Sequence, residues 1–269
     1  MSTHQFTIRD AALRYTRFGA GEKLLIAFHG YGDLGGQVFE QLEEGLGGRY
    51  TVCAPDLPWH GQTQWPEASF DLEDMRALVG HIVREEGQRR FELMGHSFGS
   101  RLLLCLLSEF IDQVDRLHLL APDGLRRVIA YDWLPPRWMR RTLIRSLSSP
   151  NWLLTLQEGL FRLGLQPKAS YNFVRYNLGV PERRERLFRF WMSLDSFRLA
   201  VQPTRALIKA KELPIDLYMG RYDRIILLKY GEAYIEGLPK ARLQVLEKGH
   251  QVIGKELNAL LFKNNKELT

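Results

Sequence analysis

The sequence predicts an α/β protein with a mostly parallel, doubly wound sheet and one helical insertion. Three observations support this prediction. Apolar runs of strand character alternate with amphipathic helical runs over residues 6–122 and again over 215–262. One serine lies between two glycines, at a point where a strand turns abruptly into a helix. From 125 to about 207 the strand pattern disappears, so these residues form the predicted insertion.

The strands and helices of the predicted sheet domain begin at the N-terminus. Two weakly alternating runs, Phe6–Ile8 and Ala12–Tyr15, flank a short turn and predict an antiparallel hairpin. Continuous apolar residues over Lys23–Phe28 are typical of an inner strand that is covered on both faces. Later strands are predicted at 50–54, just before Gly95, and at 114–122. Helices are predicted at 37–46, at 70–86 with Asp71 as the N-cap, and directly after Ser97.

The predicted insertion separates this part from the last strands and helices. It contains helical runs broken by prolines, many arginines and twelve aromatic side chains. Strands resume at 215–220 and 242–246, and helices are expected at 228–238 and 252–262. We therefore assign 1–124 and 208–269 to the core domain and 125–207 to a helical cap that lies across the sheet.

The charge of the chain is concentrated in the predicted cap. Residues 124–210 hold 14 Arg and 2 Lys against 2 Asp and 3 Glu, which gives this segment a net charge of +11. The whole chain carries +6, so the remainder carries −5. A solvated basic face on the helices is the simplest interpretation, and attraction of anions is the alternative. Peripheral contact with a membrane surface is also left open, whereas no nucleic-acid-binding motif is present.

The rest of the composition indicates a cytoplasmic globular protein that acts on a small molecule. No apolar run approaches the roughly 20 residues of a membrane span, and the first 18 residues lack the apolar core of a signal peptide. The only two cysteines, Cys53 and Cys105, have no metal-ligand spacing and suit a reducing compartment. We expect neither a metal nor an organic cofactor.

Gly95-His96-Ser97-Phe98-Gly99 fits the G-x-S-x-G pattern of a nucleophile elbow. In this turn the serine has φ > 0 and its hydroxyl is exposed above the sheet. Glycines on both sides are needed because Cβ atoms there would collide with the neighbouring strand and helix. The N–H groups that begin the helix favour an anion next to the serine.

Three loops at the carboxyl ends of predicted strands carry Ser97, Asp223 and His250. Such loops share one edge of a parallel sheet, so residues distant in the sequence can meet there. Serine needs an adjacent base, and the base needs an acid that orients it. We therefore predict Ser97 as the nucleophile, His250 as the general base and then acid, and Asp223 as the residue that fixes the imidazole. Asp123 also follows a strand and is the alternative acid.

Four other histidines could be nominated as the base. His29 and His60 are expected to brace the loops in which they stand, and His118 is expected to be a half-buried sheet residue. His96 precedes Ser97 directly, and its side chain should point away from the nucleophile because neighbours at a strand end face opposite ways. His250 remains the preferred base because it follows the last strand and a glycine.

The predicted oxyanion hole consists of the backbone N–H groups of Phe98 and Tyr31. Tyr31 belongs to the glycine-rich loop that follows Lys23–Phe28. The aromatic cap would supply an apolar pocket and exclude water from it. Four side chains are candidate substrate contacts: Trp59, Arg101, Trp133 and Trp138. Arginines near the start of the cap would hold a carboxylate or phosphate if they faced the site: Arg126, Arg127, Arg137, Arg140 and Arg141.

Five motifs together resemble those of the α/β-hydrolase superfamily with a cap after the sixth strand. They span nearly all of the core domain: His29-Gly30, Asp56-Leu57-Pro58-Trp59-His60-Gly61, Gly95-His96-Ser97-Phe98-Gly99, Gly220-Arg221-Tyr222-Asp223 and Gly249-His250. The resemblance implies the same triad of Ser97, Asp223 and His250. One departure is Trp59, which stands where the family usually has the first glycine of Asp-x-Pro-Gly-His-Gly. The cap matches no particular subfamily.

The leading expectation is a carboxylesterase-like or lipase-like serine hydrolase that acts on a small to medium ester, thioester or related carbonyl compound. A C–C bond hydrolase or a lyase acting on an anionic substrate is the alternative within the fold. The run Gly99-Ser100-Arg101 is similar to one in a capped lyase of menaquinone synthesis. A ligand-binding member without catalysis is a third possibility, although it would not need an intact triad. Epoxide hydrolases and dehalogenases of this fold place Asp where Ser97 stands, which disfavours both.

Overall fold

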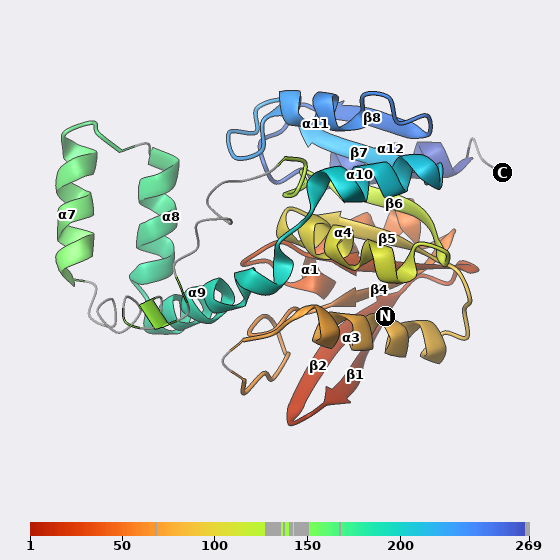
Figure 1. The fold of residues 1–269 in the computed structure, drawn as a ribbon, viewed down its shortest axis with the longest axis horizontal. Helices are drawn as coiled ribbons and strands as arrows, with labels where there is room; N and C mark the ends of the chain where they lie inside the picture. Colours follow the sequence, from red (N-terminus) through yellow and green to blue (C-terminus); the bar gives the residue numbers. More distant parts are fainter. Residues whose placement is uncertain are drawn as a thin grey trace. The chain divides into compact units, whose positions relative to one another are not determined.

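The computed structural model describes residues 1–67, 69–126, 136, 138–139, 142, 151–166 and 168–266 (Figure 1). The chain divides into two compact units. The first, here called the sheet unit, comprises 1–67, 71–128 and 197–269. The second, the helical unit, comprises 68–70 and 129–196.

A single eight-stranded sheet is present among the described residues, in the order β1-β2-β4-β3-β5-β6-β7-β8 (Figure 1). The strands are β1 (Ser2–Ile8), β2 (Ala11–Phe18), β3 (Lys23–Phe28), β4 (Tyr50–Pro55), β5 (Phe91–His96), β6 (Val114–Leu120), β7 (Ile215–Gly220) and β8 (Ala241–Leu246). The hairpin β1–β2 and the pair β2–β4 are antiparallel, whereas the other neighbours are parallel. The predicted mostly parallel sheet is confirmed.

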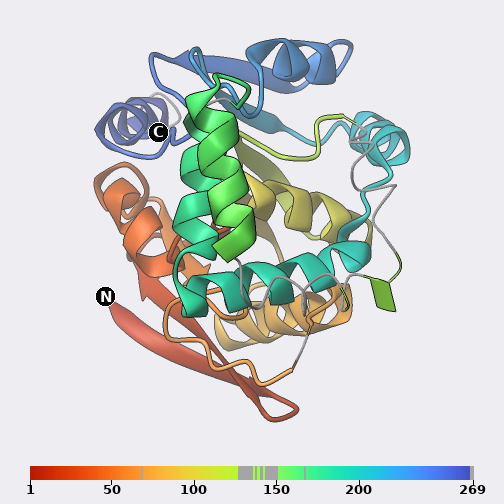
Figure 2. The same cartoon turned by 90° about the vertical axis from the view of Figure 1, so that its left-hand side faces the viewer.

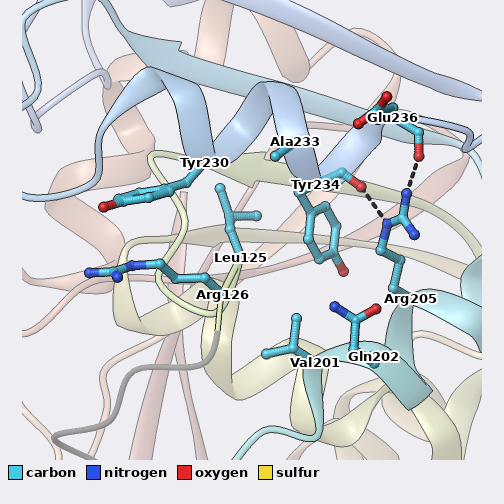
Figure 3. Close-up of a pocket in the computed structure, with 9 residues that line it drawn as sticks. All are labelled: Leu125, Arg126, Val201, Gln202, Arg205, Tyr230, Ala233, Tyr234 and Glu236. Carbon is cyan, nitrogen blue, oxygen red and sulfur yellow. Dashed lines mark hydrogen bonds between the residues drawn. The ribbon is translucent and has the colours of Figure 1, made fainter.

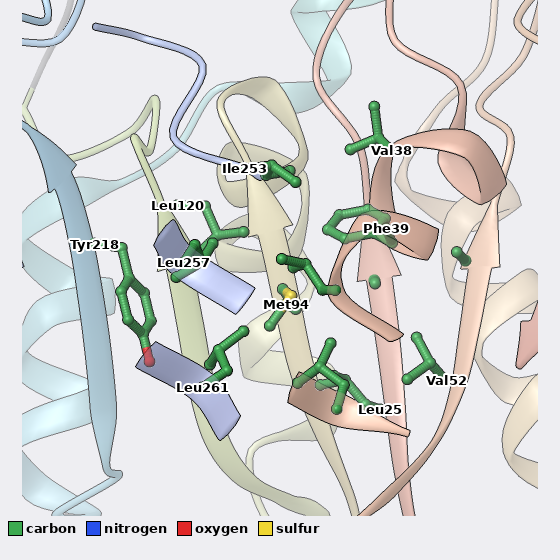
Figure 4. Close-up of a cluster of buried hydrophobic side chains, with 14 of the residues drawn as sticks. Leu25, Val38, Phe39, Val52, Met94, Leu120, Tyr218, Ile253, Leu257 and Leu261 are labelled. Atoms are coloured by element: carbon green, nitrogen blue, oxygen red, sulfur yellow. The ribbon is translucent and has the colours of Figure 1, made fainter. Parts of the chain in front are cut away.

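Helices cover both faces of this sheet. They are α1 (Gly35–Phe39), α2 (Glu43–Leu46), α3 (Leu72–Glu85), α4 (Phe98–Phe110), α10 (Val201–Ala210), α11 (Leu228–Ile235) and α12 (Lys255–Lys266). Apolar side chains of α1 and α12, such as Phe39 and Leu257, pack on Leu25, Met94 and Leu120 of the strands (Figure 4). Helices α3, α4 and α10 lie on the opposite face (Figure 1). Successive side chains of an inner strand point to opposite faces of the sheet, and helices cover both faces. The inner strands are therefore apolar on both faces, as expected for a parallel sheet.

Helix boundaries follow the local capping chemistry. Asp71 is the N-cap of α3 as predicted, and its side chain and that of Asp74 form a reciprocal capping box with 3.0 Å hydrogen bonds. The helix predicted at 37–46 is instead divided into α1, a 3-10 turn at Glu40–Leu42, and α2. The helix predicted from Val252 begins at Lys255, because Gly254 has φ of 144° and interrupts the helical backbone.

The helical unit contains α7 (Asn151–Arg162), α8 (Lys168–Leu178) and α9 (Pro181–Ser193), followed by a 3-10 turn at Leu194–Phe197 (Figure 2). Helix α8 contacts both of the others, and a small apolar cluster centred on Leu178 and Phe188 joins them. The segment 68–70 belongs to this unit because the N–H of Phe70 donates to the Ser193 hydroxyl, 3.0 Å away. Residues 197–207 of the predicted cap belong to the sheet unit, since α10 packs on α4.

A buried polar cluster links three strands of the sheet. Glu92 on β5 is 2% exposed and lies 2.8 Å from the imidazole of His118 on β6. The hydroxyl of Tyr50 on β4 donates to the same carboxylate at 2.9 Å. Burial by itself raises the pKa of Glu92, but the hydrogen bonds and nearby positive charge lower it to about 2. His118 is therefore fully buried and bonded, rather than half-buried as predicted.

None of the helices in the described ranges combines the length and apolar character that crossing a bilayer requires.

Candidate active site

Ser97 lies in a strained turn between β5 and α4. Its φ of 50° and ψ of −116° are unusual for a residue with a side chain. A Cβ on Gly99 would collide with the backbone oxygen of Phe28, and one on Gly95 would lie 2.6 Å from the N–H of Ser100. Only glycine fits at both positions, which is the physical reason for the G-x-S-x-G spacing. The turn is held by the N–H of Ser97, which donates to Leu120 at 2.9 Å.

The structure brings Ser97, His250 and Asp223 together. The Oγ of Ser97 lies 2.9 Å from Nε2 of His250, and Nδ1 of His250 lies 2.8 Å from Oδ2 of Asp223. Ser97 and His250 are 153 positions apart in the chain. They meet because β5, β7 and β8 are parallel strands of one sheet, and each delivers its loop to the same edge.

The carboxylate of Asp223 is fixed on both oxygens. While Oδ2 faces His250, Oδ1 accepts the N–H groups of Ile225 and Ile226 at 2.7 and 2.9 Å. The side chain of Asp223 is fully buried, and that of His250 is 22% exposed. Burial by itself raises the pKa of Asp223. The hydrogen bonds from His250, Ile226 and Ile225 lower it by more than burial raises it, so the pKa is below its ordinary value. An ionised Asp223 holds the proton of His250 on Nδ1 and leaves Nε2 to accept from the serine.

The alternative acid, Asp123, has a different partner. Its two carboxylate oxygens accept from Nε and Nη2 of Arg101 at 2.8 and 2.9 Å. Arg101 is only 3% exposed and also donates to the carbonyl of Phe197. This bidentate pair ties α4 to the loop after β6. The guanidinium of Arg101 therefore binds Asp123 inside the sheet unit, which gives Arg101 a structural role there and not the predicted contact with substrate.

The glycine-rich loop after β3 passes directly beside Ser97. A Cβ on Gly30 would lie 3.2 Å from the Cβ of Ser97, so Tyr31 follows at the point where the loop leaves the serine. The ring of Tyr31 packs edge-on against His60, 5.7 Å between centres. Phe98, the other predicted donor, begins α4 immediately after Ser97. Both predicted backbone donors therefore belong to segments that adjoin the serine.

His29 and His60 brace two loops against each other, as the sequence predicts. The N–H of Leu57 donates to Nε2 of His29 at 2.9 Å, and that of Gly32 donates to Nε2 of His60 at 3.0 Å. Each histidine therefore belongs to one loop and accepts from the other. The other nitrogen of His29 lies 2.7 Å from the carbonyl of Gly30. Complete burial lowers the pKa of His29, which keeps its ring neutral in this role.

His96 makes a link that the sequence analysis missed. Its Nδ1 lies 3.0 Å from the carboxylate of Asp33, and its Nε2 lies 3.3 Å from the backbone carbonyl of His250. Its ring bonds neither to the hydroxyl of Ser97 nor to the imidazole of His250. It instead ties the loop after β3 to the loop that carries the base. Asp33 follows two glycines in a loop, and no local pattern indicates its distant partner.

The remaining predicted substrate contacts are aromatic. Trp59 is partly exposed, has φ of 63°, and donates its indole N–H to the carbonyl of Trp65 at 3.0 Å. Its positive φ explains why a glycine is usual at this position of the motif. Trp138, in the helical unit, is 68% exposed. Trp133 lies outside the described residues. No cluster of three or more metal-ligating side chains occurs in the part of the chain that the structure describes.

A mostly parallel sheet whose loops after β5, β7 and β8 bring serine, aspartate and histidine together at one edge defines a known class of protein. The model of the alpha/beta hydrolase fold family matches residues 23–253, and the chain belongs to this family. The resemblance that the sequence motifs indicated is thereby confirmed.

Two proteins with related sequences each match somewhat less than half of this chain. The dihydrolipoyllysine-residue acetyltransferase component of an acetoin cleaving system from Cupriavidus necator is 32% identical over 125 residues, which are 46% of this chain and 33% of that protein. A 2-(acetamidomethylene)succinate hydrolase from Mesorhizobium japonicum is 29% identical over 112 residues, 42% of this chain and 36% of that protein. The matched part thus spans about a third of the length of each relative.

Among solved structures, a thermophilic esterase from Thermogutta terrifontis matches with a TM-score of 0.69 and 16% identity. The match covers 100% of this chain and 98% of the esterase chain. At this identity the likeness shows the fold, and the activity has to be argued from the site.

Proposed function

We propose that this protein is a serine hydrolase that acts by acyl transfer on a small to medium ester or thioester. The single observation that carries the proposal is the continuous hydrogen-bonded chain from the Ser97 hydroxyl through His250 to Asp223. Membership of the alpha/beta hydrolase fold family, whose matched relatives include a hydrolase, agrees with it.

In the proposed reaction, Nε2 of His250 takes the proton of the Ser97 hydroxyl as Oγ attacks the substrate carbonyl carbon. The carbonyl oxygen becomes negative and accepts hydrogen bonds from the N–H groups of Phe98 and Tyr31. The tetrahedral intermediate collapses, the alcohol or thiol leaves with the proton from His250, and an acyl group remains on Oγ. Water then attacks the acyl carbon, His250 takes its proton, and the acid departs as Oγ regains a proton.

The surroundings of the site are part of the same proposal. Trp59, in the sheet unit, is the proposed contact for the apolar portion of the substrate, and the cap role of 125–207 stays a prediction from the sequence. We place the protein in the cytoplasm because both of its cysteines, Cys53 and Cys105, are free thiols.

The first experiment is active-site labelling with a fluorophosphonate probe. Wild-type protein, Ser97→Ala and the matched control Ser100→Ala would be labelled and mapped by mass spectrometry. Ser100 is a suitable control because it stands three residues away but donates its buried hydroxyl to Gly95, 2.5 Å away. We expect the wild type and Ser100→Ala to carry the adduct on Ser97, and Ser97→Ala to carry none.

The same preparations would be assayed on p-nitrophenyl esters of increasing chain length. Turnover that disappears in Ser97→Ala and persists in Ser100→Ala supports the proposal. A folded wild type that neither labels nor turns over any ester contradicts it and favours a ligand-binding member of the fold. Labelling without ester turnover would favour the C–C hydrolase or lyase alternative.

A further inference from the structure

A cavity of about 380 Å³ lies within the sheet unit, and none of the three residues of the candidate active site lines it (Figure 3). Its walls come from α10, α11 and the end of the loop that follows β6. Leu125, Val201 and Ala233 give it apolar surface, and Tyr230 and Tyr234 add two aromatic rings. This volume falls in the lower range of small-molecule sites.

One polar group in this cavity lacks a partner. Tyr234 is 2% exposed, and its hydroxyl forms no hydrogen bond within the described residues. Figure 3 shows the hydroxyl pointing toward the side chain of Gln202, which is exposed and can turn aside. Burial raises the pKa of Tyr234, so its hydroxyl keeps a proton to donate. A buried donor without an acceptor costs free energy, and a ligand oxygen would remove that cost.

Two guanidinium groups line the same cavity. The carbon at the centre of the Arg126 guanidinium lies 4.3 Å from the centre of the Tyr230 ring. Arg205 donates through Nε to the backbone carbonyl of Tyr234 at 2.8 Å, and through Nη2 to that of Glu236. Neither arginine forms an ion pair with a carboxylate in the described part of the chain. The cavity therefore combines apolar walls with two guanidinium groups and one carboxylate, that of Glu236, which forms an ion pair with neither arginine in the described structure.

We propose that this cavity is a second binding site, which takes a small organic carboxylate with an apolar or aromatic body. The apolar body would lie against Leu125, Val201 and the two tyrosine rings. The carboxylate would accept from the Tyr234 hydroxyl, on the side of the cavity where the Arg205 guanidinium also lies (Figure 3). Arg126, which stacks on Tyr230 at the other side, adds positive charge without contacting the carboxylate. This site is independent of the proposed acyl transfer, because it shares no residue with it.

The test is calorimetric titration of the full chain with 4-phenylbutyrate, compared with 4-phenylbutan-1-ol. The two probes have the same apolar body, and only the first carries a carboxylate. We expect 4-phenylbutyrate to bind at one saturable site. We expect 4-phenylbutan-1-ol to bind at least about tenfold more weakly, because it cannot form the charge-assisted hydrogen bond of a carboxylate. The readout needs no turnover, so it stands whether or not Ser97 is a nucleophile.

Three variants locate the site, and a fourth is the control. Tyr234→Phe removes only the hydroxyl, Arg126→Gln removes an exposed charge, and Ala233→Phe fills the cavity. We expect Tyr234→Phe to weaken binding of 4-phenylbutyrate by about tenfold, Arg126→Gln to weaken it by a smaller factor, and Ala233→Phe to abolish it. Arg76→Gln, which removes an exposed arginine paired with Glu73 on α3, should leave binding unchanged.

Thermal unfolding of each variant is the control that distinguishes a loss of binding from a loss of folding. Tyr234→Phe should be no less stable than the wild type, because its hydroxyl has no hydrogen bond to lose in the described structure. The proposal is overturned if the wild type binds no 4-phenylbutyrate, if all cavity variants bind it with wild-type affinity, or if the alcohol binds as tightly as the carboxylate.

Discussion

The loops after β6 and β7 each place an aspartate beside the Ser97 turn, but the two aspartates do different things. Asp223, after β7, faces an imidazole, and two backbone N–H groups hold its other oxygen. Asp123, after β6, is bound on both oxygens by the guanidinium of Arg101. The same residue type at the same edge of the sheet thus faces an imidazole in one loop, where we propose that it orients the base, and binds a guanidinium in the other. The partner decides the role.

The largest expected effect is on catalysis and belongs to Asp223. Asp223→Asn keeps an oxygen for the N–H groups of Ile225 and Ile226 but no longer fixes the proton on Nδ1 of His250. We expect kcat on the best p-nitrophenyl ester to fall by about 10³- to 10⁴-fold. Asp123→Asn, assayed under conditions where it is folded, should lose less than about tenfold. Equal losses of kcat in Asp223→Asn and Asp123→Asn would contradict the different roles given to the two aspartates.

The next effect is on stability and belongs to Asp123. Asp123→Asn leaves the guanidinium of Arg101, which is 3% exposed, without its anionic partner. Breaking a buried ion pair in this way typically costs about 3–5 kcal/mol of unfolding free energy. Urea denaturation followed by circular dichroism measures the loss. The double variant Asp123→Asn/Arg101→Met should recover part of the lost unfolding free energy. If Asp123→Asn alone were as stable as the wild type, the structural role of Asp123 would be contradicted.

The smallest effect is the dependence of stability on pH. Hydrogen bonds lower the pKa of Asp223 in the folded protein, so the folded state binds fewer protons than the unfolded state below the ordinary value of about 3.9. The stabilisation is complete above that value and is lost as the pH falls through the lowered pKa. Asp223→Asn removes this titration.

Urea denaturation between about pH 3 and 6 checks the sign. The unfolding free energy of the wild type should fall more steeply toward low pH than that of Asp223→Asn. Parallel curves for the two proteins would show that Asp223 is not stabilised in its ionised form.

Much of the fold follows from local patterns. The strand over Lys23–Phe28 has the predicted bounds, and the N-terminal hairpin contains both predicted runs but extends over Ser2–Ile8 and Ala11–Phe18. An apolar run and an alternating run each indicate how many faces of a strand are buried. Asp71 caps α3 because its side chain reaches a backbone N–H three residues away. The helical pattern over 37–46 does not indicate its 3-10 turn, because that turn depends on how Phe39 and Leu42 pack against the sheet.

The sequence by itself determined the turn around Ser97 and nominated Asp223 and His250, because glycine spacing and strand ends are local features. The sequence preferred Asp223 over Asp123, but only the tertiary structure shows the partner of each aspartate, since each partner lies more than 20 positions away. The link from His96 to Asp33 spans 63 positions, and the cavity between α10 and α11 has no local signal at all. The physical reason is the same in each case. Sheet order and helix packing decide which loops meet, and those contacts act between residues that are far apart in the chain.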